Sequence, residues 1–299
     1  MKHILKATKE YKKITECVSD AIPLLSLAAI KSQIRQGEVK LNDTRITHDC
    51  AVKTGDTIKI FLPASLEPKT VSVDFVYDSP HVAVVHKPVL CETETHLTQM
   101  VQATYPNAVP VHRLDRNTTG LVVFAKTTAA EEALLRLFKA HKVEKKYRAT
   151  VMGKPKKSDS ITVYLYKDAK HARVWVRDQP SQGYKAATLA YTVTRQYENH
   201  ADIDINLVTG RTHQIRATMM HVGHPVIGDS KYGNEKVNRE HKAAFPKLCA
   251  YKIKFAHAEE DCALLKELAG VEVLLKESKN SNTKPKGVAI AKPQFAKPK

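Results

Sequence analysis

From about residue 70 to residue 256, short segments of alternating apolar and polar residues are separated by turn-forming residues. Residues 202–207 show the pattern most clearly, with Ile203 and Ile205 set between polar neighbours. A period of two is typical of β-strands that have one buried and one solvated face. The other expected strands span residues 71–76, 121–125, 146–151, 161–166, 173–177 and 187–194. Because few helical stretches interrupt them, the pattern predicts an α+β domain built on short strands.

Two local signals mark further elements. Residues 128–131, Thr-Ala-Ala-Glu, have the form of a capping box, which predicts the start of a helix. Residues 82–85 are a run of four apolar residues, which predicts a buried strand ending at His86 and Lys87.

Breaks in composition divide the chain. Two prolines bracket a short polar stretch at residues 63–69, which predicts a linker between an N-terminal domain, 1–62, and a larger domain, 70–277. Residues 278–299 hold six lysines, no acid and three Lys-Pro dipeptides. Such a segment has too few large apolar residues to offset the entropy of ordering, so we expect a flexible basic tail.

Charge is the most informative bulk property. The chain has 48 Lys and Arg against 31 Asp and Glu, a net charge of +17. Such a field concentrates polyanions, so nucleic acid is the leading expected partner. A merely soluble basic protein, or one that touches acidic membranes, is the alternative from charge alone.

Other classes of protein fit poorly. No run approaches the roughly 18 to 20 apolar residues of a membrane-spanning helix. The polar N-terminus does not resemble a secretory signal. The five cysteines are widely spaced and include no CxxC, which favours a reducing cytoplasm over a disulfide scaffold. We therefore expect a cytoplasmic protein, and nothing in the pattern demands an oligomer, so we expect a monomer.

The N-terminal domain has a recognisable order of elements. Residues 26–35 predict a short helix with apolar residues at intervals of three and four, and Gly37 follows it. Residues 39–43 predict a strand entering a turn, and residues 57–60 an alternating strand. Over residues 22–62 this order resembles the S4 RNA-binding domain, which implies a small α+β unit that binds structured RNA. The basic residues expected at phosphates are Lys31, Arg35, Lys40 and Arg45.

Residues 111–126 place a carboxylate, Asp115, between Arg113 and Arg116 and continue into a turn and an apolar strand. An acid beside a base in a loop is by itself an ordinary surface ion pair of small energetic weight. The whole string is more informative, because HRLDRNTTGLVVFAK resembles the active-site motif of the RluA-type pseudouridine synthases. These enzymes isomerise uridine to pseudouridine in structured RNA, and the resemblance implies that Asp115 is the catalytic residue.

Two later segments are similar to the same family in order and spacing. Residues 144–151 are similar to the segment with the family's active-site tyrosine, which implies that role for Tyr147. The string VTGRTHQIR, residues 208–216, is similar to its arginine motif. The resemblance implies that Arg211 pairs with the aspartate and that Ile215 lines the pocket.

The resemblance also implies how substrate is held. Arg113 would occupy the gap left by a base that has been flipped out of its stack. The further residues expected at the substrate are His112, Arg116 and Gln214. Residues 87–96 depart most from the family pattern, because this loop is more acidic and lacks the usual glycine.

The reaction breaks N1–C1′ and joins C5 to C1′ without oxidation or an imported group, so we expect no cofactor. We expect no metal either. His213, His221 and His224 lack the spacing of a zinc site and have no thiolate or HExxH motif nearby.

The family's catalytic domain implies a mixed, mainly antiparallel sheet with a central cleft, here preceded by the small α+β S4-like domain. We expect an RNA pseudouridine synthase, and we favour large-subunit ribosomal RNA because an S4-like module suits large structured targets. The alternative substrate is transfer RNA, which would make the protein a tRNA-directed synthase. A non-catalytic RNA-binding or ribosome-assembly factor on the same fold is the alternative from another class.

Overall fold

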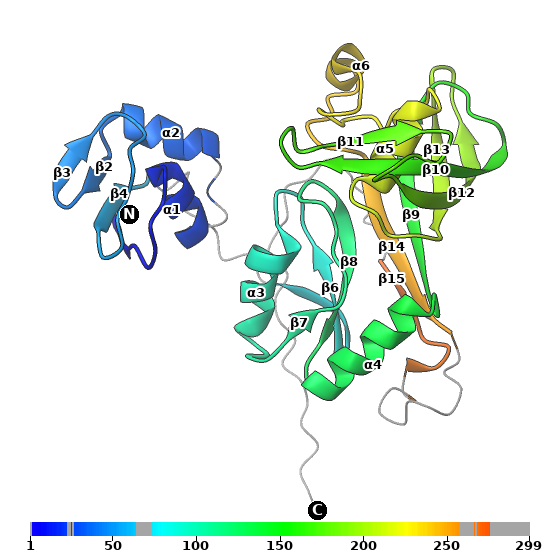
Figure 1. The fold of residues 1–299 in the computed structure, drawn as a ribbon, viewed down its shortest axis with the longest axis horizontal. Coiled ribbons are helices and arrows are strands. Elements are labelled where there is room, and N and C mark those ends of the chain that lie inside the picture. The colour runs from blue at the N-terminus through cyan, green and yellow to red at the C-terminus, as the bar shows by residue number, and fades with distance from the viewer. Residues whose placement is uncertain are drawn as a thin grey trace, which may run out of the picture.

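The computed structural model describes residues 2–22, 25, 27–63, 73–256, 266 and 268–275 of the chain. Its strands form one sheet of four and one of eleven (Figure 1). The smaller sheet and two helices make an N-terminal unit with the elements β1 (Lys2–Lys6), α1 (Ile14–Ala21), α2 (Leu27–Arg35), β2 (Val39–Leu41), β3 (Thr44–Ile46) and β4 (Thr57–Phe61).

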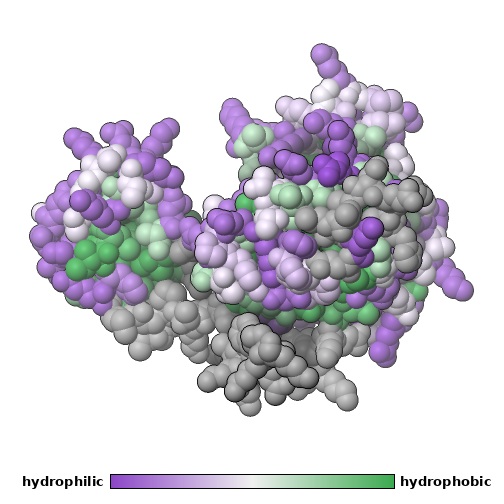
Figure 2. Space-filling view, turned by 90° about the horizontal axis from the view of Figure 1, so that it is seen from below, coloured by the Kyte–Doolittle hydropathy of each residue, from purple (hydrophilic) through white to green (hydrophobic). Residues whose placement is uncertain are grey.

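The N-terminal unit has an antiparallel sheet in the order β1-β4-β2-β3 and a hydrophobic core of its own. Ile14 and Ile30 from the helices meet Ile58 and Ile60 from β4 in that core, and all four are fully buried. The helix and strands expected here are confirmed, whereas β1 and α1 carried no signal that we identified. Figure 2 shows hydrophilic side chains over much of the surface, with smaller hydrophobic areas.

The larger sheet runs in the order β11-β10-β12-β13-β9-β14-β8-β6-β5, with β15 beside β14 and β7 beside β8. Its strands are β5 (Asp74–Asp78), β6 (Val82–Lys87), β7 (Val109–Pro110), β8 (Thr119–Ala125), β9 (Val143–Met152), β10 (Ser158–Asp168), β11 (Arg173–Arg177), β12 (Lys185–Gln196), β13 (His200–Leu207), β14 (Leu248–Phe255) and β15 (Glu272–Leu274). Among these strands only the β14–β8 pair is parallel, which confirms the expected mixed, mainly antiparallel sheet.

The strands expected from alternation are present, with ends that differ by a few residues, and residues 71–72 of the first one lie outside the described residues. The helical elements around the sheet are η1 (Thr93–Leu97), α3 (Thr98–Gln102), α4 (Thr128–Lys139), α5 (Gln214–His221) and α6 (Glu235–Glu240). The helix expected from the capping box is α4, which begins at Thr128, but its N-cap is one residue earlier than the capping box indicated. The Thr127 side chain, rather than that of Thr128, accepts the hydrogen bond from the Ala130 backbone amide.

One glycine allows the two parallel strands to meet. Gly120 in β8 has a φ of +131°, and a Cβ built on it would lie 2.4 Å from the Ala250 carbonyl oxygen of β14. No side chain fits that gap, so the glycine of the string at 112–126 is needed for the close approach of the strands. This approach places the loop before β8 beside β9 and β14.

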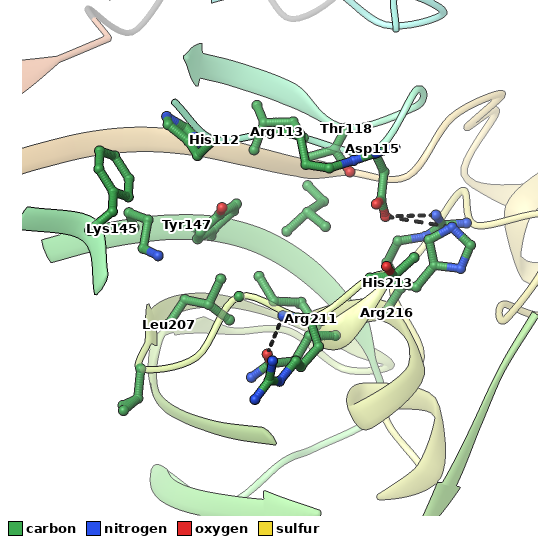
Figure 3. Close-up of a pocket in the computed structure, with 18 of the residues that line it drawn as sticks. His112, Arg113, Asp115, Thr118, Lys145, Tyr147, Leu207, Arg211, His213 and Arg216 are labelled. Atoms are coloured by element: carbon green, nitrogen blue, oxygen red, sulfur yellow. Dashed lines mark hydrogen bonds and ion pairs between the residues drawn. The ribbon is translucent and has the colours of Figure 1, made fainter. Parts of the chain in front are cut away.

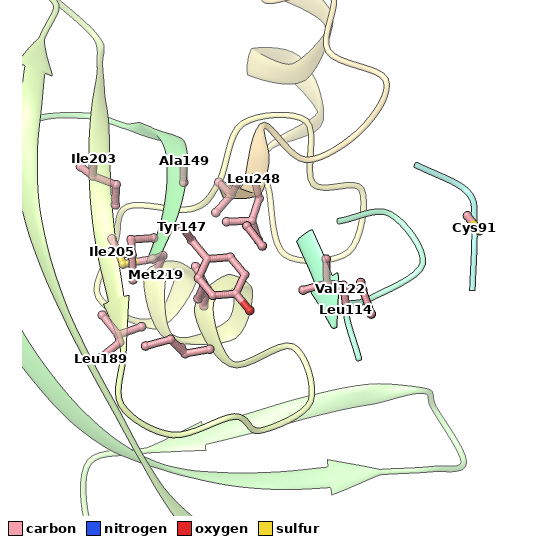
Figure 4. Close-up of a cluster of buried hydrophobic side chains, with 14 of the residues drawn as sticks. Cys91, Leu114, Val122, Tyr147, Ala149, Leu189, Ile203, Ile205, Met219 and Leu248 are labelled. Carbon is pink, nitrogen blue, oxygen red and sulfur yellow. The ribbon is translucent and has the colours of Figure 1, made fainter. Parts of the chain in front are cut away.

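The hydrophobic core of the larger unit surrounds this junction. Figure 4 shows Tyr147 of β9 among Leu114, Val122, Met219 and Leu248, which come from segments far apart in the chain. The proposed domain limits stay a prediction, and residues 64–69 of the linker and the tail at 278–299 lie outside the described residues. Among the described helices none is long and apolar enough to span a membrane.

Candidate active site

A cavity of about 460 Å³ opens between the loop at residues 112–115, β9 and the segment at 207–216 (Figure 3). Its wall includes Asp115, Tyr147, Arg211 and Ile215, so the three motifs found in the sequence converge on one site. The expected central cleft is therefore present.

Asp115 is held by Arg216. The Arg216 Nη1 donates a hydrogen bond of 2.9 Å to Asp115 Oδ2, and the Asp115 side chain stays 19% exposed on the cavity side. Among the described residues, none donates to the other carboxylate oxygen, Oδ1. One oxygen is thus fixed, and the other is left for a ligand in the cavity.

The arginine itself is anchored from behind. Arg216 Nε and Nη2 donate to the two carboxylate oxygens of fully buried Asp229, at 2.6 and 3.0 Å. Although burial opposes charge, the hydrogen bond and charge of Arg216 outweigh it and hold the pKa of Asp229 below its usual value. Backbone amides of Lys231 and Tyr232 also donate to Asp229. The bidentate pair is therefore between Arg216 and Asp229, and Asp115 receives the remaining edge of the guanidinium.

The predicted pairing of Arg211 with Asp115 is wrong. Arg211 is exposed at the cavity mouth, and its Nε donates to the Ala186 carbonyl oxygen at 3.4 Å. The reason lies in the local turn, because Gln214 Oε1 accepts hydrogen bonds from the Arg211 backbone amide and the Thr209 hydroxyl. This contact fixes Arg211 before α5 begins, while Arg216, inside α5, points inward.

Gln214 was expected to bind substrate, but both ends of its amide are engaged by the protein. Besides the two bonds to Oε1, its Nε2 donates to the Thr188 carbonyl oxygen at 3.0 Å. Gln214 is buried and shapes the turn that starts α5. Its amide therefore holds the turn before α5, and because Gln214 also lines the cavity, its contact with substrate stays a prediction.

His213 approaches the same oxygen of Asp115 as Arg216 does, with Nε2 4.0 Å from Oδ2 (Figure 3). Its Nδ1 is 2.8 Å from the Tyr232 hydroxyl, and that hydroxyl accepts a hydrogen bond from the Val174 backbone amide. The Tyr232 proton is therefore available to His213 Nδ1, which leaves the Nε2 proton facing Asp115. Burial lowers the pKa of His213, which favours this neutral ring.

Tyr147 and Ile215 line the cavity as expected. Tyr147 is 6% exposed and Ile215 is 5% exposed. Burial, with a contribution from the charge of Asp115, raises the pKa of Tyr147, so its hydroxyl keeps its proton at neutral pH. That hydroxyl points into the cavity (Figure 3), and it forms no hydrogen bond with a described residue.

A buried lysine fixes the Asp115 loop. Lys87 is fully buried, and its Nζ donates to the carbonyl oxygens of Pro88, Cys91 and Arg116, at 3.0, 2.7 and 3.2 Å. The three protons of the ammonium thus tie the end of β6 to the turn after Asp115. Burial lowers the pKa of Lys87 to about 8.

The three other residues of the motif that were expected at the substrate, His112, Arg113 and Arg116, lie in different places relative to the cavity. His112 lines the cavity, stacks on Phe138 at 5.0 Å and accepts a hydrogen bond from the Val123 amide. Burial lowers the pKa of His112 to about 3, so the ring is neutral.

Arg113 lies at the cavity mouth in an exposed ion pair with Glu94, 2.7 Å long. Arg116 is exposed, lies outside the cavity wall and donates to Leu90.

The four basic residues of the N-terminal unit lie on α2 and the β2–β3 hairpin. Lys31 and Arg35 are exposed one turn apart on α2. Lys40 and Arg45 are directly opposite each other in the hairpin. A Cβ at Gly37, just after α2, would lie 3.0 Å from the Arg45 side chain, so the hairpin cation reaches the end of the helix.

The arrangement suits a reaction at a single bound base. It supplies a carboxylate with one free oxygen, a protonated phenol and an apolar wall, with arginines at the mouth that fit phosphates. Within the described residues, no cluster of His, Cys, Asp or Glu has the form of a metal site. His213, His221 and His224 have separate partners, Tyr232, Asp178 and Met152.

Comparison with known proteins agrees with this geometry. Residues 75–221 match the RNA pseudouridylate synthase family, and this span contains all three motifs. The chain belongs to that family, in its RluA-type branch, and it is an RNA pseudouridine synthase.

The chain aligns with most of the length of its named relatives. The chain is 31% identical over 245 residues to ribosomal large subunit pseudouridine synthase D of Haemophilus influenzae, covering 74% of this chain and 73% of that enzyme. It is 31% identical over 266 residues to the enzyme of the same name from Neisseria meningitidis serogroup B, covering 80% and 70%. The structure of human RNA pseudouridylate synthase domain containing 1 has a TM-score of 0.56 at 23% identity, covers 73% of this chain and 94% of its own, and supports the fold.

Sequence reasoning missed Arg216, Asp229, His213 and Tyr232 as a connected network. Arg216 and Asp229 stand in segments that the family resemblance covers, so the signal was present. What was lacking was the start of α5, because a helix beginning at Gln214 turns Arg216 and not Arg211 toward the core.

Proposed function

We propose that this enzyme isomerises uridines of large-subunit ribosomal RNA, with Asp115 as the catalytic residue. The supporting observation is the Asp115–Arg216 pair, which leaves one carboxylate oxygen free in a cavity shared with Tyr147. A base inside a helix cannot reach this cavity, so the target uridine must be flipped out at a cost of a few kcal/mol. Arg113 at the mouth is placed to fill the gap once it leaves Glu94.

Asp115 then uses its free oxygen to attack the sugar or the ring, or to remove a sugar proton. In each route the N1–C1′ bond breaks, C5 joins C1′, Asp115 is released in its starting form and the C5 proton is lost to water. Tyr147 faces the same space, and its protonated hydroxyl is placed to donate a hydrogen bond to the bound base. Ile215 keeps one face of the base dry. Nothing in these steps requires a redox group.

Tritium release from RNA labelled at uridine C5 tests the role of Asp115. We expect Asp115→Asn to abolish release while RNA binding in a mobility-shift assay is kept. Asp159→Asn on β10 is the matched control, because that carboxylate lies outside the cavity, and it should behave as wild type. Equal release from Asp115→Asn and wild type would end the proposal for this residue.

The choice of ribosomal RNA rests on two grounds. Several relatives carry the name ribosomal large subunit pseudouridine synthase D. We also propose that residues 1–62 are an S4-like domain that binds structured RNA through Lys31, Arg35, Lys40 and Arg45. Mapping pseudouridines in ribosomal and transfer RNA from a strain that lacks this enzyme tests the choice. Loss from transfer RNA alone would favour the tRNA-directed alternative.

A further inference from the structure

Three aromatic rings lie on the solvent side of the β10–β11 hairpin, outside the active-site cavity. Tyr166 and Trp175 are directly opposite each other in the two strands, and they are 42% and 48% exposed. Tyr184 lies beside Tyr166, with ring centroids 5.4 Å apart at an angle of 33°. These three residues, here called the aromatic platform, border a shallow depression that also includes Arg177 and Gln182.

Two arginines lie against the rings of the aromatic platform. The guanidinium of Arg177 lies 5.1 Å from the centre of the Tyr184 ring, and that of Arg173 lies 5.5 Å from the centre of the Trp175 ring. Two acids lie nearby, and one of them, Asp168, contacts the platform itself through the indole of Trp175. Asp168 accepts hydrogen bonds from His171 and Trp175, and Asp178 pairs with His221.

This composition is unusual for a solvated sheet face. β11 is an edge strand, and on its inner side Val174 is buried in the core. Tyr166, Trp175 and Tyr184 belong to no hydrophobic core cluster of the described residues. Flat rings with guanidinium groups beside them match the face of an unpaired nucleobase and its phosphates, because every base has a π-surface and the arginines supply charge.

The platform connects with the catalytic cavity. Arg211, at the cavity mouth, donates to the Ala186 carbonyl oxygen of β12. In the sheet register Ala186 is opposite Tyr164, and Tyr164 is opposite Arg177. Tyr164 lies two residues before Tyr166 and shares its face of the sheet. One row across the strands therefore leads from the cavity mouth to the platform.

We propose that the aromatic platform stacks an unpaired nucleobase of the substrate RNA, at a position outside the flipped uridine. This deepens the proposed function, because it rests on RNA being the substrate. It assigns a second contact with single-stranded character, separate from the chemistry at Asp115. A protein segment or a second copy of this chain would be the competing occupant, and the test below separates these.

The chain contains a single tryptophan, so its fluorescence reports on the platform alone. We expect Trp175 emission to be quenched on titration with a single-stranded oligouridine RNA, in wild type and equally in Asp115→Asn. Stacking of a base on one ring typically strengthens binding by a factor of roughly ten or more. We therefore expect Tyr166→Ala to raise the dissociation constant, measured by anisotropy of labelled RNA, about tenfold. Arg239→Ala, on α6, is the matched control, because Arg239 does not line the depression, and it should leave the dissociation constant unchanged.

Binding of the RNA by anisotropy without any change in Trp175 emission would overturn the proposal. So would an unchanged dissociation constant for Tyr166→Ala. If emission instead changes with protein concentration in the absence of RNA, the platform is a contact between copies and the proposal also fails. Failure of the catalytic proposal is distinguishable, because it shows in tritium release, while quenching in Asp115→Asn reports binding only.

Discussion

Arg216 donates a single hydrogen bond of 2.9 Å to Asp115 and uses its other edge for Asp229. The position of the proposed catalytic carboxylate therefore depends on a second, fully buried carboxylate. Burial lowers the pKa of Arg216, but the hydrogen bond and charge of Asp229 outweigh it and raise that pKa above its usual value. The cation is permanent, and Asp115 is oriented before substrate arrives.

Replacing the two motif arginines should separate their roles. We expect Arg216→Lys to lower turnover about 100-fold, because a lysine cannot hold both carboxylates with fixed geometry. Arg211→Lys is the matched variant in the same motif and should keep most turnover, since Arg211 does not contact Asp115. Single-turnover tritium release measures both. Greater loss in Arg211→Lys than in Arg216→Lys would contradict the geometry.

Tyr147→Phe should separate chemistry from stability. The hydroxyl forms no hydrogen bond with a described residue, so its removal should leave the free energy of unfolding within about 0.5 kcal/mol of wild type. Turnover should fall at least about tenfold if the phenol takes part in proton transfer. Urea unfolding and tritium release give the two values. A large loss of stability with unchanged turnover would show that the tyrosine is structural.

Glu94→Gln should strengthen RNA binding. Its ion pair with Arg113 is exposed on both sides and is worth less than about 1 kcal/mol, so its loss frees Arg113 at small cost. We expect the dissociation constant for substrate RNA to improve by about twofold to fivefold at low salt. Anisotropy of labelled RNA measures this, with Glu235→Gln, whose pair with Arg239 is also exposed, as the control. Weaker binding would show that Glu94 has a role of its own.

Gly120→Ala should disrupt the junction of β8 and β14. The added Cβ would lie 2.4 Å from a backbone oxygen, so we expect a loss of about 3 kcal/mol or more in the free energy of unfolding. Gly223→Ala isolates the clash from the strain of positive φ, because Gly223 has a φ of +85° with no atom within 4 Å. It should cost only about 1 kcal/mol. Similar losses in both variants would mean that the strands can separate locally.

Lys87 should give a pH signature in stability. Its pKa falls to about 8 on folding from a usual value near 10.5, because burial disfavours the charge. Between those two pH values the unfolded chain binds more protons than the folded chain, so the free energy of unfolding rises with pH in that window. We expect wild type to gain stability relative to Lys87→Met from about pH 8 to pH 10, and no change below pH 7. The measurement is the free energy of unfolding of both proteins as a function of pH. The same pH dependence in wild type and Lys87→Met across this range would contradict a depressed pKa of Lys87.

Local pattern was sufficient for much of the fold. Alternation located β10 to β13, and the apolar run at residues 82–85 located β6. The helix α5 was missed because its residues, QIRATMMH, are nearly all buried and carry no polar face that would reveal a helical period. Without that helix, the inward direction of Arg216 could not be inferred, and the wrong arginine was paired with the aspartate.

By itself the sequence determined the strand-rich class, the three motif segments and the identity of the carboxylate and phenol, because these are encoded in neighbouring residues. Only the tertiary structure decided that Arg216 and Asp229 orient Asp115, and that both ends of the Gln214 amide are bonded within the turn before α5. Partners in a hydrogen-bond network come from strands and helices distant in the chain. Which carboxylate an arginine contacts depends on the direction in which each edge of its guanidinium points in the folded protein. Local periodicity in the sequence does not predict that direction.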